Sequence, residues 1–151
     1  MRAPSDTVRE HWPEYLMEAA GLGFFMISAA VVTALLEYPH SPLYQLLPDP
    51  VIRRALIGMA MGLTAIGIIY SPWGKRSGAH LNPAVTVTFF RLGKIQGLDA
   101  FFYVLAQCVG GLIGLLIAAM AIGMAIEHPT VNYVVTVPGF GGAGVAEVAL
   151  E

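Results

Sequence analysis

The chain has 151 residues, of which 56% are hydrophobic and only 12% are charged, and its mean hydropathy is +0.68. Soluble domains carry about 25% charged residues, so this composition predicts an all-α membrane protein. The net charge of −2 indicates no basic surface for nucleic acid. The single cysteine, Cys108, excludes an internal disulfide. No cysteine–histidine spacing typical of a metal site occurs, so we expect neither a metal nor another cofactor.

The first part of the chain predicts a polar tail and one membrane span. Residues 1–13 are polar and are expected to form a cytoplasmic tail before the first repeat, 14–151. The apolar run 15–36 would form a helix of ~33 Å, enough to cross a hydrocarbon core of about 30 Å. Residues 37–54 contain four prolines and therefore predict a loop at the membrane surface rather than one helix.

Two further apolar runs predict two more spans. They cover residues 55–70 and 100–126, and neither contains a charged side chain. Glycines four residues apart let two helices approach closely. We therefore expect close packing at Gly58 and Gly62 in the second span and at Gly110 and Gly114 in the third.

The basic residues are divided unevenly between the two sides of the membrane. With the N-terminus inside, six fall on the cytoplasmic side and two, Arg53 and Arg54, on the other. The inner six are Arg2, Arg9, Lys75, Arg76, Arg91 and Lys94. Cytoplasmic loops carry the excess of Lys and Arg, so the bias predicts a cytoplasmic N-terminus in a multi-pass protein of the cell membrane.

The segment 71–90 is too broken to span and too apolar for a solvent loop, which predicts a re-entrant loop and a half-helix. Asn is a favoured N-cap and Pro is favoured at the first helical position, so Asn82 and Pro83 predict the start of this helix. Its N-terminus carries a partial positive charge, which repels cations and protons in a narrow pore. The backbone carbonyls of Gly78, Ala79 and His80 would precede it as acceptors.

The string SGAHLNPAVT, residues 77–86, resembles the first Asn-Pro-Ala loop of the aquaporin and glycerol-facilitator family, the major intrinsic proteins. The segments EAAGLGFF (18–25) and YVLAQCVGG (103–111) are similar to the family's first and third helices. The resemblance implies the first of two inverted repeats, with three spans, one half-helix, and the start of a fourth helix at 145–151. The second Asn-Pro-Ala loop and its following arginine lie outside the sequence.

The resemblance also implies roles for individual residues. Asn82, Pro83 and Ala84 would form the pore motif, and Met61 lies near the second helix's contribution to the outer constriction. Glu18 would hold the pore loop by accepting hydrogen bonds, although a side chain one turn from the helix start can instead snorkel to the surface. Gln107 would pack near the half-helix or line the pore.

The implied function is a passive channel for water or small neutral solutes such as glycerol, assembled as a homotetramer in the lipid bilayer, with no enzymatic activity. The chain is expected to be a fragment of a full channel or a natural half that needs a separate partner. A non-conducting subunit that assembles with or regulates full-length channels is the alternative. An enzyme using Glu18 and His80 as acid and base is disfavoured, because no third group or substrate pocket accompanies them.

Overall fold

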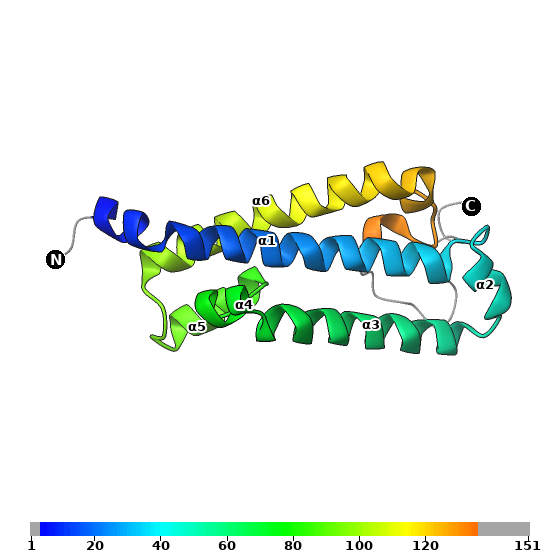
Figure 1. The fold of residues 1–151 in the computed structure, drawn as a ribbon, viewed down its shortest axis with the longest axis horizontal. Coiled ribbons are helices and arrows are strands. Elements are labelled where there is room, and N and C mark those ends of the chain that lie inside the picture. Colours follow the sequence, from blue (N-terminus) through cyan, green and yellow to red (C-terminus); the bar gives the residue numbers. More distant parts are fainter. Residues whose placement is uncertain (1–3, 136–151) are drawn as a thin grey trace, which may run out of the picture.

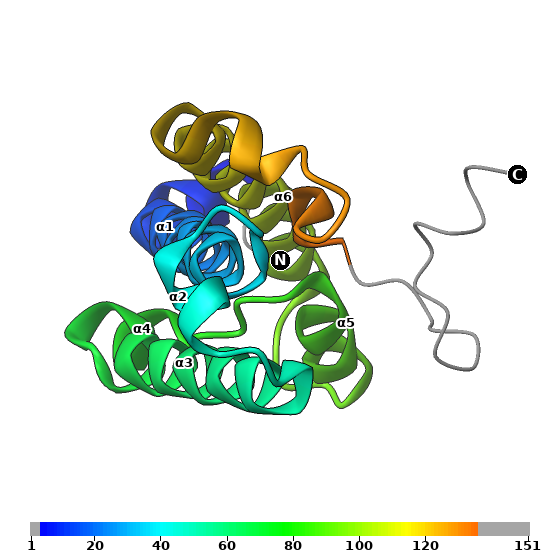
Figure 2. The ribbon, with the colours of Figure 1, turned by 90° about the vertical axis from the view of Figure 1, so that its right-hand side faces the viewer.

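The computed structural model describes residues 4–135, all of whose regular elements are helical. Three long helices run side by side, with α1 (Pro4–Glu37) between α6 (Gly97–Ile122) and α3 (Pro50–Tyr70) (Figure 1). Figure 2 looks along this bundle, with α1 on the left and α5 on the right, where α5 packs against α6. The shorter elements are α2 (Pro42–Leu46), α4 (Pro72–Ser77), α5 (Pro83–Arg91), η1 (Gly123–Ile126) and η2 (Asn132–Val134).

Three helices are long and apolar enough to cross a membrane: Val8–Glu37, Pro50–Tyr70 and Gly97–Ile126. This confirms the prediction of an all-α membrane protein with three long apolar helices. The predicted start of a fourth helix at 145–151 lies outside the described residues.

Helix α1 begins at Pro4, so most of the segment expected to be a tail is helical. An internal proline normally removes one helical hydrogen bond and favours a kink, yet the helix continues through Pro13. Side chains on both sides of Pro13 bind the same buried carboxylate of α6: His11 Nδ1 lies 2.8 Å and Tyr15 Oη 2.6 Å from Asp99 Oδ1. These tertiary bonds hold the extension of α1 against α6.

Helix α3 also begins earlier than the expected span, because Asp49 and Pro50 form an effective helix start. The Asp49 carboxylate accepts a hydrogen bond from the Val51 amide at 2.7 Å, and Pro50 takes the first helical position. The buried Arg53 fixes the preceding loop, since its guanidinium donates to Glu37 at 3.2 Å and to the Leu47 carbonyl at 2.9 Å.

The glycine pair of α6 packs closely, as predicted. A Cβ at Gly110 would overlap the backbone of Ala19, and one at Gly114 would overlap the backbone of Gly23. The most extensive helix contact among the described residues is accordingly between α1 and α6. Only residues without a side chain permit two helix backbones to approach this closely.

Close packing was also predicted at the glycine pair of α3, but this pair meets no other helix among the described residues. Nothing among the described residues lies within 4 Å of a Cβ placed at Gly58 or Gly62. The face of α3 that meets α1 carries other side chains, and the Thr64 hydroxyl bonds Ser28 of α1 at 2.8 Å. At 100° per residue Gly62 lies on the opposite side of the helix from Thr64, which leaves the glycine face uncovered.

Candidate functional site: the loop between α4 and α5

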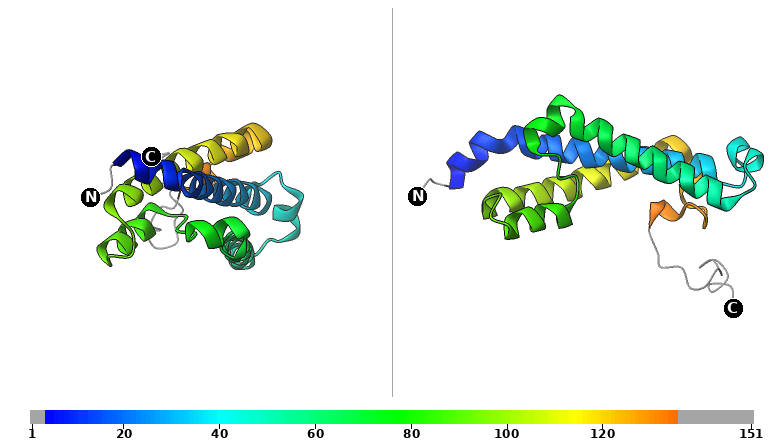
Figure 3. Two further views of the ribbon diagram at one scale, coloured as in Figure 1. Left: turned by 60° about the vertical axis from the view of Figure 1, so that its left-hand side comes forward. Right: turned by 90° about the horizontal axis from the view of Figure 1, so that it is seen from below.

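The predicted pore motif lies where α4, the loop 78–82 and α5 meet. Both short helices gather at the end of the bundle nearer the N-terminus (Figures 1 and 3). Helix α5 has nine residues, a length of ~13.5 Å. This is less than half of the about 30 Å of a hydrocarbon core, so α5 does not span a bilayer.

Asn82 caps α5. Its Oδ1 accepts a hydrogen bond from the Ala84 amide at 2.8 Å, and Pro83 occupies the first helical position. Asn82 is exposed, and no described residue accepts a hydrogen bond from its Nδ2. The side chain therefore satisfies one amide of the helix and keeps its own donor free at the positive end of the helix dipole.

The loop before the half-helix adopts a strained backbone. Gly78 has φ = 92°, Ala79 has φ = 46° and Leu81 has φ = 51°. Left-handed conformations suit glycine but cost a residue with a Cβ about 1–3 kcal/mol each. Ala79 and Leu81 keep these conformations only because surrounding contacts fix the loop.

Glu18 supplies those contacts. Its carboxylate is fully buried and accepts four hydrogen bonds, two on each oxygen. The Ser77 hydroxyl donates to Oε1 at 2.7 Å and the His80 amide at 3.0 Å, while the Leu81 amide and Gln107 Nε2 each donate to Oε2 at 2.8 Å. An ionised carboxylate only accepts, and all four partners are donors, so this buried charge is fully satisfied.

Three carbonyl oxygens of the loop, unlike the amides bound to Glu18, have no hydrogen-bond donor among the described residues. While the amides of His80 and Leu81 are bound to Glu18, no described residue donates a hydrogen bond to the carbonyl oxygens of Gly78, Ala79 or His80. The neighbouring Ser77 carbonyl, by contrast, accepts from the Tyr103 hydroxyl at 2.7 Å. The loop therefore keeps three consecutive acceptors free, and the free donor of Asn82 follows after one intervening residue.

Besides Ser77, two buried side chains of this cluster were not predicted from the sequence. Thr86 is fully buried and contacts both His80 and Gln107 through its hydroxyl, and Tyr103 is buried and donates to the carbonyl of Ser77, the last residue of α4. Thr86 reads as one of several small residues in an apolar half-helix. Only the packing of α5 against α6 distinguishes it from the exposed Thr88.

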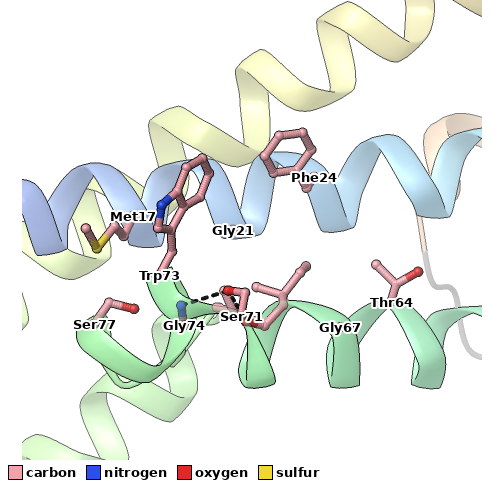
Figure 4. Close-up of a pocket in the computed structure, with 11 residues that line it drawn as sticks. Met17, Gly21, Phe24, Thr64, Gly67, Ser71, Trp73, Gly74 and Ser77 are labelled. Carbon is pink, nitrogen blue, oxygen red and sulfur yellow. Dashed lines mark hydrogen bonds between the residues drawn. The ribbon is translucent and has the colours of Figure 1, made fainter.

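A cavity borders this cluster, and Ser77 and Leu81 are among its lining residues. It has a volume of about 320 Å³ and lies between α1 and α3, with α4 at one end (Figure 4). Its lining is mainly apolar and includes Met17, Phe24 and Trp73. Neither Asn82 nor the predicted constriction residue Met61, which lies half-buried in α3, lines this cavity or the second one between α1 and α6.

Most of the predicted site residues thus come together in space. Glu18, His80 and Gln107 share one buried cluster, and Gly78, Ala79, Asn82, Pro83 and Ala84 form the adjoining loop and helix start. No group of three or more metal-binding side chains occurs among residues 4–135.

The fold and this site define a helical membrane protein with several spans, and comparison with known proteins gives its family. The Major intrinsic protein family matches residues 7–149. The chain therefore belongs to the major intrinsic protein family.

Individual relatives match a shorter stretch. Probable aquaporin AqpM of Archaeoglobus fulgidus is 36% identical over 94 residues, 62% of this chain and 37% of that protein. Aquaporin Z of Photorhabdus laumondii is 32% identical over 91 residues, 60% of this chain and 37% of that protein. Human aquaporin-5 is 47% identical over 58 residues, which cover 38% and 22% of the two chains. The matched region thus spans 37% of the first two relatives and 22% of the third, and no solved structure matches the chain.

Proposed function

We propose that this chain forms one half of a passive channel for water or small neutral solutes such as glycerol. The observation that carries the proposal is the arrangement of hydrogen-bond donors and acceptors in the loop 78–82. Its bound amides face Glu18, its three free carbonyls offer acceptors, and Asn82 adds a free donor. A water molecule or a polyol hydroxyl both donates and accepts, so a row of acceptors followed by a donor suits single-file passage.

The half-helix would exclude protons and cations from this path. The N-terminus of α5 carries about half an elementary positive charge and lies directly at Asn82. Roles for Asn82, Pro83 and Ala84 in the pore, for Gly78–His80 as its acceptors and for Met61 at the outer constriction belong to this proposal. So do a homotetrameric assembly and an orientation in the cell membrane with the N-terminus in the cytoplasm, which the six-to-two division of basic residues favours.

A second candidate is a non-conducting half-channel that assembles with or regulates full-length channels. It is favoured by the exposure of Asn82 and by the uncovered glycine face of α3 at Gly58 and Gly62. Asn82 is an exposed polar group and the glycine face of α3 is a surface suited to close helix packing, and the described residues provide a partner for neither.

Stopped-flow osmotic swelling of proteoliposomes separates the two candidates. The protein is first extracted from its own membranes, and its mass is compared with the 16.1 kDa of this chain to show which polypeptide is reconstituted. We expect Asn82→Ala to lower osmotic permeability at least ~10-fold, because the substitution removes both the free donor and the helix cap. Gln45→Ala, which removes an exposed amide on α2, is the matched control. Swelling at the rate of empty liposomes would favour the non-conducting subunit, and equal swelling of wild type and Asn82→Ala would reject the proposed pore path.

A further inference from the structure

The buried cluster around Glu18 continues as a chain of hydrogen bonds to the ring of His80. Gln107 Nε2 donates to Glu18 Oε2 at 2.8 Å and lies 3.0 Å from Thr86 Oγ1. Thr86 Oγ1 in turn lies 3.1 Å from His80 Nδ1. Three elements, α1, α6 and α5, therefore reach the loop histidine through one sequence of side chains.

The carboxylate at the start of this chain fixes its direction. Glu18 only accepts, so Gln107 must present its amide nitrogen, with one N–H toward Glu18 and the other toward Thr86. Thr86 Oγ1 is then the acceptor of the second N–H, which leaves the hydroxyl hydrogen free to be donated. Three acceptors lie within reach: His80 Nδ1 at 3.1 Å, Gln107 Oε1 at 3.3 Å and the Asn82 carbonyl at 3.4 Å.

The His80 nitrogen is the best of these acceptors. It is the nearest of the three, while the Gln107 oxygen belongs to the amide that already donates to the same hydroxyl. The Asn82 carbonyl already accepts the Thr86 backbone amide at 3.1 Å as the first bond of α5. We propose that Thr86 is a positioning residue that donates its hydroxyl hydrogen to His80 Nδ1 and so holds the imidazole neutral with its proton on Nε2.

The surroundings of the ring agree with this assignment. His80 is buried and contacts Phe89 at a tilt, with ring centroids 4.6 Å apart, and Tyr103 edge-on at 5.3 Å. The Tyr103 hydroxyl is engaged with the Ser77 carbonyl and does not compete for the ring nitrogens. His80 lies between the spans, and burial lowers its pKa below the ordinary 6.5, while the Glu18 carboxylate acts in the opposite direction.

This assignment has a consequence for the pore, which rests on the proposed function. The only lone pair of the neutral ring is on Nδ1 and is occupied by Thr86. His80 could then take up a proton from the single file of water molecules in the proposed pore only by breaking its bond to Thr86. The histidine nearest the Asn-Pro-Ala motif would therefore be prevented from relaying protons, independently of the dipole of α5.

The assignment is tested by solid-state ¹⁵N NMR of the reconstituted protein labelled at histidine, which needs no conduction and so can fail separately from the proposed function. His80 signals are identified by their absence in His80→Gln. At pH 7 we expect one neutral tautomer, with a protonated Nε2 and an unprotonated, hydrogen-bonded Nδ1. Thr86→Val should abolish the single tautomer or shift the Nδ1 resonance. Thr86→Ser should restore the wild-type spectrum, and Thr88→Val, whose hydroxyl bonds only the Ala84 carbonyl of its own helix, should leave it unchanged.

Two results would overturn the assignment. A wild-type spectrum with the proton on Nδ1, or with both nitrogens protonated, would show that Thr86 does not donate to His80. A folded Thr86→Val protein with an unaltered His80 spectrum would show that another group selects the tautomer. Because the wild-type spectrum is decisive by itself, the test does not depend on the valine variant folding.

Discussion

Replacing Glu18 by glutamine changes the loop's central acceptor with almost no change in shape. The carboxylate accepts four hydrogen bonds from Ser77, His80, Leu81 and Gln107. A glutamine keeps one oxygen and turns the other position into an N–H donor, which then faces two donors. Hydrogen bonds to a charged group contribute about 1.5–3 kcal/mol each, so losing two of them destabilises the protein by about 3–6 kcal/mol.

Two measurements check this prediction. Reversible unfolding in mixed micelles gives the free energy of unfolding, and amide hydrogen exchange gives the local effect on the loop. The His80 amide binds Oε1 and the Leu81 amide binds Oε2, so one of the two loses its acceptor, and its exchange should be about 10- to 100-fold faster. The matched control is Glu14→Gln, one turn earlier on α1, whose carboxylate bonds the half-exposed Arg76 at 2.8 Å. Solvent screens the half-exposed Arg76, so this single ion pair contributes about 0–1 kcal/mol, and the variant should lose less stability than Glu18→Gln.

Two outcomes would contradict this role of Glu18: a loss of stability in Glu18→Gln no larger than in Glu14→Gln, or unaltered exchange in the loop. Either result would mean that the strained loop conformation is held by something other than the buried carboxylate.

Two further predictions use the same unfolding assay. Gly114→Ala should destabilise the protein by about 1–3 kcal/mol, since the new methyl group overlaps the backbone of Gly23. Its control, Gly58→Ala, places a methyl group that meets no described atom and should be neutral or slightly stabilising. Equal effects of the two substitutions would contradict the close α1–α6 packing. Asp99→Asn should cost about 1–3 kcal/mol, because the bonds from Tyr15 and His11 lose their charged acceptor, and little change in unfolding would mean that α1 is not held there.

The hydrogen bonds of the site join residues far apart in the chain. Glu18 binds Ser77 across 59 residues and Gln107 across 89. The resemblance predicted that Glu18 supports the loop, but the sequence could not name its four donors. Thr86 and Tyr103 lie within the strings that resemble the family, but the sequence gives neither of them a partner or a role. Their importance follows from burial, which depends on how α5 and α6 pack.

The two glycine pairs illustrate the same division. Gly58–Gly62 and Gly110–Gly114 have the same spacing and the same apolar surroundings, yet only the second pair meets another helix among the described residues. Spacing determines that two glycines share a face of a helix. Which way that face turns depends on the contacts of the whole helix, here the bond between Thr64 and Ser28.

The sequence by itself determined the class of protein, the three apolar helices and the capped start of the half-helix at Asn82 and Pro83. These features depend on composition and on interactions between near neighbours, so they are readable from a short stretch of chain. Only the tertiary structure decided the extension of α1 through Pro13, the donors of Glu18 and the left-handed backbone of the loop. Each of these needs a distant partner, because a buried charge or a strained backbone persists only where packing brings in the groups that satisfy it.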